Sequence, residues 1–115
     1  MNLDLLYYLR EHILEINWSH RFTEDTLFIY GEYNQYEVGS PNTKYIVNLE
    51  YNYTTLKTKL IIDKHINGKK VYNISNVCFP KLTNLKELVY KIKKDTIWSI
   101  NTSKFDVYLT TRSWI

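Results

Sequence analysis

The sequence predicts an α+β fold: an antiparallel sheet of about five or six strands with two helices packed on one face. One apolar repeat with helical spacing stands near the start of the chain, and a second follows residue 80. Between them lie stretches rich in β-branched and aromatic residues, separated by turn residues. Strands grouped between helices, rather than alternating with them, are typical of α+β proteins. The expected order is α-β-β-β-β-α-β-β.

The first expected helix covers Leu3 to Ile16, with Asn2 available as its cap. Its apolar stripe comprises Leu5, Leu6, Leu9, Ile13 and Ile16. Tyr7 and Leu14 widen this stripe on a second flank, so that only a narrow polar strip remains. Such a helix is either covered on two sides or uses one side to bind a partner.

Four antiparallel strands are expected after the first helix. They cover residues 26–36, 44–51, 55–65 and 69–78. Turn residues separate them at Gly39–Pro41, at Asn52 and at Asn67–Gly68. The apolar alternation changes phase between the second and third of these strands, which indicates a turn near residues 52–54.

The register of the Asn67–Gly68 hairpin stays open on sequence grounds. Asn-Gly favours a two-residue type I′ loop, which would place Ile61 opposite Ile74. The alternation of apolar residues instead favours a three-residue loop that pairs Ile62 with Ile74. The two signals disagree, and neither overrides the other.

A second helix is expected after Pro80, capped by Thr83 or Asn84 and ending near Lys94. Its single apolar stripe comprises Leu82, Leu85, Leu88, Val89 and Ile92. Residues 96–100 and 104–111 are then expected to form a last hairpin, although residues 96–100 could instead prolong the helix. The expected core comprises Leu5, Leu9, Ile13, Phe28, Val47, Leu49, Leu60, Ile62, Ile74, Leu85, Leu88, Ile92 and Val107.

The length and composition are those of one globular domain, expected over residues 1–115. Hydrophobic residues make up 44% of the chain, which is enough to build a core. No apolar run approaches the roughly 18 residues of a membrane-spanning helix, and acids stand where a signal peptide would carry basic residues. We therefore expect a cytoplasmic protein without a membrane partner.

Charge is divided unequally along the chain. Residues 1–50 hold three Lys or Arg against eight acids, a net charge of −5, and residues 51–115 hold twelve against four, a net charge of +8. A partner would meet an acidic half and a basic half separately, so the total of +3 is a poor guide to binding.

Single-stranded nucleic acid is one partner that the basic half could bind. Lysines and tyrosines together supply phosphate contacts and stacking platforms for bases. The candidate residues are Tyr51, Tyr53, Lys57, Lys59, Lys69, Lys70, Lys91 and Lys94. Arginine, whose forked side chain grips phosphates and guanine, occurs only three times, and whether the lysines form one patch depends on the fold. Nucleic-acid binding is therefore the alternative interpretation.

Catalysis and cofactor binding are not expected. Glu11, His12 and Glu15 have a spacing that could hold one edge of a metal site, but helix-surface residues of this kind are usually solvated. The single cysteine, Cys78, is more typical of a small structural residue than of a nucleophile. A small metal-dependent enzyme is the weakest of the three interpretations.

The main hypothesis is a non-catalytic module that binds another protein. Alanine is absent while Asn, Lys, Ile and Tyr abound, which is the composition of an A/T-rich genome. We expect a phage or mobile element of a low-GC bacterium, and an inhibitor or adapter of a host or toxin protein, for example an anti-CRISPR protein. Self-association as a homodimer is a further alternative. Aromatic anchors dominate such interfaces, and the candidates are Tyr7, Tyr8, Tyr33, Tyr36 and Trp114.

Overall fold

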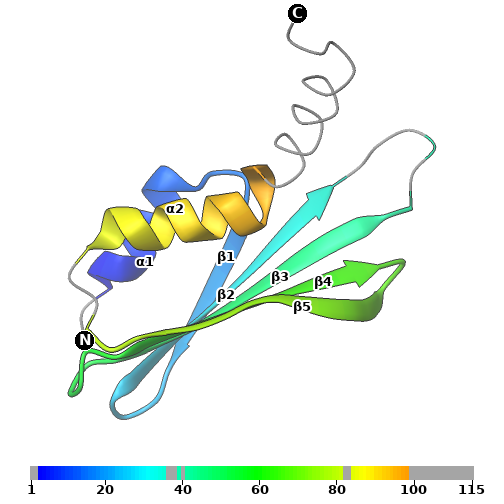
Figure 1. The fold of residues 1–115 in the computed structure, drawn as a ribbon. Helices are drawn as coiled ribbons and strands as arrows, with labels where there is room; N and C mark the ends of the chain where they lie inside the picture. Colours follow the sequence, from blue (N-terminus) through cyan, green and yellow to red (C-terminus); the bar gives the residue numbers. More distant parts are fainter. Residues whose placement is uncertain (1–2, 36–38, 40, 82–83, 99–115) are drawn as a thin grey trace, which may run out of the picture.

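Five antiparallel strands form one sheet in the computed structural model, and each strand pairs with the next strand of the chain (Figure 1). The model describes residues 3–35, 39, 41–81 and 84–98. Its elements are α1 (Asp4–His12), β1 (Asn17–Phe22), β2 (Thr26–Gln35), β3 (Thr43–Asn52), β4 (Thr58–Ile66), β5 (Lys69–Phe79) and α2 (Leu85–Asp95). The predicted α+β class is therefore confirmed, with two helices and a five-stranded antiparallel sheet.

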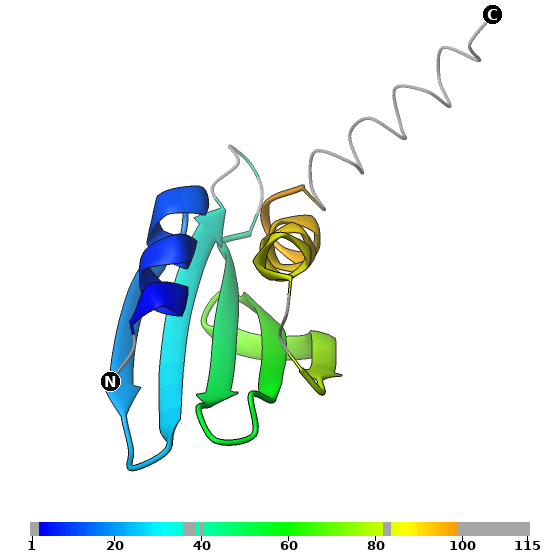
Figure 2. The ribbon, with the colours of Figure 1, turned by 90° about the vertical axis from the view of Figure 1, so that its left-hand side faces the viewer.

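Both helices lie on the same face of the sheet, α1 on the side of β1 and β2 and α2 on the side of β4 and β5 (Figure 2). Leu6 and Leu9 of α1 and Leu88 and Ile92 of α2 are fully buried between the two layers. The sheet contributes Leu27, Ile29, Val47, Leu49, Leu60 and Ile62 to this core. Burial of these apolar side chains is the main stabilising term of the fold.

The first helix is shorter than predicted, and a strand that the sequence did not predict follows it. α1 ends at His12, where the Ile13 N–H donates to the Leu9 carbonyl, and residues 14–16 form a connection to β1. Ile13, the residue that follows α1, is still buried, so the apolar repeat of the sequence continues past the end of the helix. Along β1, Trp18 is the one buried residue and Phe22 packs partly buried against the core, so the strand shows only a weak form of the alternation that marks a half-buried strand.

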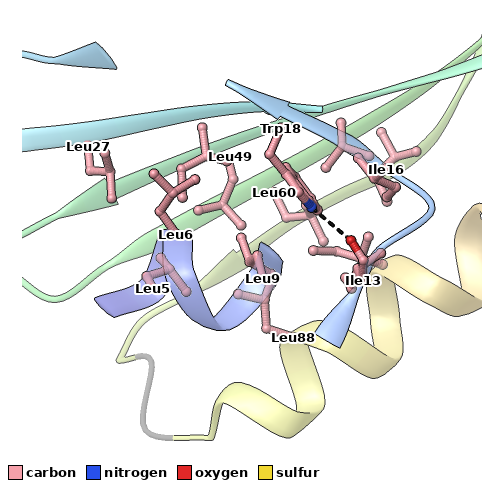
Figure 3. Close-up of a cluster of buried hydrophobic side chains, with 14 residues drawn as sticks. Leu5, Leu6, Leu9, Ile13, Ile16, Trp18, Leu27, Leu49, Leu60 and Leu88 are labelled. Atoms are coloured by element: carbon pink, nitrogen blue, oxygen red, sulfur yellow. Dashed lines mark hydrogen bonds between the residues drawn. The ribbon is translucent and has the colours of Figure 1, made fainter. Parts of the chain in front are cut away.

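Trp18 joins the connection to the sheet (Figure 3). Its indole N–H donates to the Ile13 carbonyl at 3.1 Å, which satisfies a polar group inside the core. Its ring lies against Gly31, its partner on β2, where an added Cβ would stand 2.7 Å from the indole and 2.6 Å from Ile16. There is therefore no room for a side chain at position 31.

The β4–β5 hairpin has the two-residue loop that Asn-Gly favours. Ile66 pairs with Lys69, and Asn67 and Gly68 both have positive φ, 53° and 82°, as a type I′ turn requires. Two register shifts then follow, and they leave Val71 and Ile74 as extra residues of β5.

These bulges reconcile the turn with the apolar alternation. Ile62 lies opposite Ser75, and Ile61 lies opposite Asn76. Both pairings expected for Ile74 are therefore wrong, because neither allowed for extra residues within the strand. The phase change between β3 and β4 is a turn, as predicted, in which the Asn52 side chain accepts from the N–H groups of Thr54 and Thr55.

α2 begins as predicted, with the Asn84 side chain accepting from the N–H groups of Lys86 and Glu87. After α2, Thr96 forms a turn and Ile97 and Trp98 are helical, so a strand at residues 96–98 is wrong. The remainder of the expected last hairpin, including residues 104–111, lies outside the described residues.

Most of the predicted core is confirmed. Leu85 and Ile74 pack against its rim, and the other predicted residues except Phe28 and Val107 are buried. Phe28 was assigned to the wrong face: it pairs with Arg21 and Glu50 and points away from the helices. Val107 lies outside the described residues.

Candidate binding surface

The sheet has one face that no described helix covers. Paired residues of an antiparallel sheet point to the same side, and Val47 and Ile62 point toward the helices. Their neighbours Ile46, Asn48 and Ile61 therefore point the other way. We call this second side the open face.

A hollow of about 620 Å³ lies on the open face. Residues from all five strands line it, among them Arg21, Phe28, Tyr30, Asn48 and Ile61. It therefore combines two aromatic rings and an aliphatic side chain with polar groups, which is the mixture found in binding sites.

An uncharged row crosses the middle of the open face. Successive cross-strand pairs define it, one residue from each strand. The row comprises Ser19, Tyr30, Asn48, Ile61 and Asn76. Hydroxyl and amide groups with an aromatic ring and an aliphatic side chain can contact a partner without desolvating a charge.

At one corner of the hollow, Arg21 stacks on Phe28. These residues are cross-strand partners, and the guanidinium carbon lies 4.2 Å from the ring centroid. The ring supports the planar cation and leaves the guanidinium edge free to donate hydrogen bonds. Arg21 therefore presents donors from a fixed position.

Within the uncharged row, Tyr30 is hydrogen-bonded to Glu32. Its hydroxyl donates to a carboxylate oxygen at 2.6 Å, and Lys44 approaches the other oxygen at 3.6 Å. Burial raises the pKa of Tyr30 to about 12, and the hydrogen bond to Glu32 and its charge act in the same direction. The Tyr30 ring is thereby oriented as a fixed part of the surface.

On the opposite flank, the carboxylate of Asp63 has two partners. The Asn73 amide donates to it at 2.9 Å and Lys70 lies at 3.5 Å. Because Glu32 and Asp63 are both paired with lysines, much of the charge on this face is neutralised locally.

The predicted protein-binding tyrosines are not grouped on the open face. Tyr7 lies on α1 with 55% of its surface exposed, and Tyr8 stacks on His12 with ring centroids 4.0 Å apart. Tyr33 lies on the helix-covered side, stacked on Tyr45 at 6.1 Å. Burial, followed by the charges of Glu15 and Tyr45, raises the pKa of Tyr33. Tyr36 and Trp114 lie outside the described residues.

The predicted nucleic-acid residues are spread over both faces. Tyr51 and Tyr53 pack against the core on the helix side, with ring centroids 5.2 Å apart, whereas Lys59 points to the open face. The lysines outside β4 lie in three places: Lys57 in the β3–β4 turn, Lys69 and Lys70 at the start of β5, and Lys91 and Lys94 on α2. Lys91 forms an ion pair with Asp95 at 3.0 Å. The structure therefore separates the tyrosines from most of these lysines.

The residues of the open face were not predicted, because residue type alone singles out tyrosines and lysines on both faces of the sheet. The alternation along residues 26–36 contained the necessary signal. Leu27, Ile29 and Gly31 share one side, and Phe28 and Tyr30 share the other. Because each strand pairs with the next one along the chain, the same division of residues between the two sides extends across all five strands.

The described residues contain no group of three His, Cys, Asp or Glu side chains placed to hold a metal ion. His12, one residue of the weighed metal edge, instead makes a 3.0 Å hydrogen bond between its Nδ1 and the Tyr8 carbonyl. Neither described helix has the length and apolar character needed to cross a membrane. No family model, curated protein or solved structure matches the chain.

Proposed function

We propose that this protein is a non-catalytic module that binds another protein through the open face of its sheet. The observation that supports this proposal is the hollow with its uncharged row of polar and aromatic residues. Protein interfaces have centres depleted of charge and enriched in aromatic residues, with charged groups at the rim. Arg21, Glu32 and Lys44 lie around the row in this way.

The charges of the open face favour a protein over a nucleic acid. A nucleic-acid surface needs cations that are free to replace the counterions of phosphates. Lys44 and Lys70 are instead paired with Glu32 and Asp63 on the same face, which leaves Arg21 and Lys59 as its described cations without an ion pair. Binding of single-stranded nucleic acid is therefore the alternative that the experiment must distinguish from binding of a protein.

The proposed class of partner is supported by composition and by the size of the fold. We propose a host or toxin protein, with the module acting as an inhibitor or adapter that occupies a surface of its target. The residue usage of an A/T-rich genome and the small α+β fold support this part of the proposal.

The test compares variants of the two faces in affinity capture from the native host. Ile61→Asp places a charge in the middle of the uncharged row, and Leu14→Asp places the same charge at a position that is 80% exposed in the α1–β1 connection. We expect a protein that the wild type and Leu14→Asp capture and that Ile61→Asp loses. Thermal unfolding of each variant shows whether the fold is kept.

Two results would contradict the proposal. One is a partner that Ile61→Asp and a second variant, Tyr30→Ala, retain at wild-type levels while folded. The other is binding only to oligothymidylate, with an affinity that falls steeply as salt is raised.

A further inference from the structure

β5 is an edge strand, because among the described residues only β4 pairs with it. An edge strand presents unpaired backbone N–H and C=O groups along its outer side. The two bulges disturb the first half of β5, whereas Ser75–Phe79 pairs with β4 without interruption. This second half is therefore regular enough to accept another strand.

An apolar hollow of about 490 Å³ lies beside this regular segment, between β5 and α2. Val77 and Phe79 form its sheet side. Its helix side is formed by Tyr90 with Lys86, Glu87 and Lys91, so two lysines and one acid border it. Tyr90 is 55% exposed, and its ring meets the edge of Trp98 at 5.4 Å between centroids. A strand added to β5 would point every second side chain toward this hollow.

Because the strands lie in sequence order, the acidic first half of the chain and the basic second half lie at opposite edges of the sheet. Exposed acids gather on the side of α1 and β1: Asp4, Glu11, Glu15, Glu24 and Asp25. Lysines gather on the opposite side, along β5 and α2: Lys69, Lys70, Lys81, Lys86, Lys91, Lys93 and Lys94. Within the described chain, only Lys70 and Lys91 of this set form ion pairs with acids.

We propose that β5 and the adjoining flank of α2 bind an extended, acidic segment of a partner protein. The segment adds a strand to the edge of the sheet at Ser75–Phe79. Its alternate apolar side chains enter the hollow beside Tyr90, and its acidic residues meet the lysines of α2. Backbone hydrogen bonds give such complexes affinity, and side-chain pockets and charges give them specificity. This site is separate from the open face.

The probe is the capped peptide Asp-Glu-Val-Thr-Phe-Thr-Val-Asp-Glu, titrated into the full chain at low salt. We expect binding that weakens as salt rises, with amide shifts in NMR spectra concentrated at Ser75–Phe79 and along α2. Two isomers of the peptide carry N-methyl groups on alternate backbone nitrogens. Only the isomer methylated on the side facing β5 should lose binding, because its donors are removed.

Matched variants test the hollow and the charge separately. We expect Tyr90→Ala to weaken peptide binding about tenfold, and the exposed Leu14→Ala to leave it unchanged. We expect Lys86→Glu to weaken binding about tenfold or more, whereas Arg10→Glu makes the same charge change on α1 and has little effect.

Several results would overturn the inference. They are no peptide binding at low salt, equal binding of both methylated isomers, or amide shifts on the open face instead of β5. Salt-dependent self-association in sedimentation, reversed by Lys86→Glu, would assign the β5 edge to a second copy of the chain. The β5 edge would be assigned to nucleic acid if oligothymidylate displaced the peptide and both methylated isomers bound as tightly as the unmethylated peptide.

Discussion

Tyr30 shows how a single side chain on the open face is tied to the stability of the fold. Its pKa rises from 10.0 to about 12, because burial and the neighbouring Glu32 carboxylate both disfavour the phenolate. The folded state therefore holds the Tyr30 proton more tightly than the unfolded state does. This stabilisation is complete below pH 10 and is lost as the pH rises toward 12.

We expect Tyr30→Phe to flatten this alkaline loss of stability. The variant lacks the ionisable hydroxyl, so its free energy of unfolding should fall less than that of the wild type between pH 10 and 12. Urea denaturation at a series of pH values measures the difference. Burial also raises the pKa values of Tyr33 and Tyr53, so both proteins keep a part of the loss. Equal alkaline slopes would contradict the role assigned to Tyr30.

At the scale of elements, the contact between β1 and β2 depends on the absence of a side chain at Gly31. We expect Gly31→Ala to lower the free energy of unfolding by about 1–3 kcal/mol, because the new methyl group would overlap Trp18 and Ile16. Ser19→Ala, on the exposed side of β1, is the control and should change stability by less than about 0.5 kcal/mol.

A double variant separates this steric explanation from a backbone effect. Trp18→Ala removes the ring that would collide, so Gly31→Ala should cost less in that background than in the wild type. Additive losses in the two single variants and the double variant would show that the space beside Trp18 is not the cause.

The elements that the sequence predicted well are those whose pattern is strong and local. The stripe from Leu85 to Ile92 and the Asn84 cap were sufficient for α2, and Asn67–Gly68 was sufficient for the loop between β4 and β5. β1 was missed because a single buried residue, Trp18, cannot show a period. Its packing against β2 depends on the contact of Trp18 with Gly31 across the hairpin, which the pattern of β1 alone does not contain.

The candidate site was less predictable than the fold for a related reason. Phe28 and Tyr30 belong to the open face because of the parity of β2, which becomes meaningful once the helices are known to cover one side. The hollow also depends on how the five strands are arranged in space. Residue type alone could therefore not select these side chains.

At the scale of the whole molecule, the sequential strand order places the acidic and basic halves of the chain at opposite edges. Such a charge distribution acts on surfaces as two separate patches. We expect the protein to be retained by an anion exchanger at neutral pH and low salt, although its net charge is +3. Charge reversal by Glu11→Lys with Glu15→Lys should abolish this retention and leave retention on a cation exchanger intact. Free passage of the wild type through the anion exchanger would contradict the separation of charge.

The position of α2 has a consequence for how the protein is made. Each strand can pair with its predecessor as soon as it leaves the ribosome, because every connection in the sheet is a hairpin. Leu60 and Ile62, however, belong to the same core as Leu88 and Ile92, and this core stays incomplete until α2 emerges. Exposed apolar strand faces of this kind are aggregation-prone in a nascent chain. The interval between the synthesis of β4 and that of α2 is therefore the stage at which the growing polypeptide most needs a chaperone.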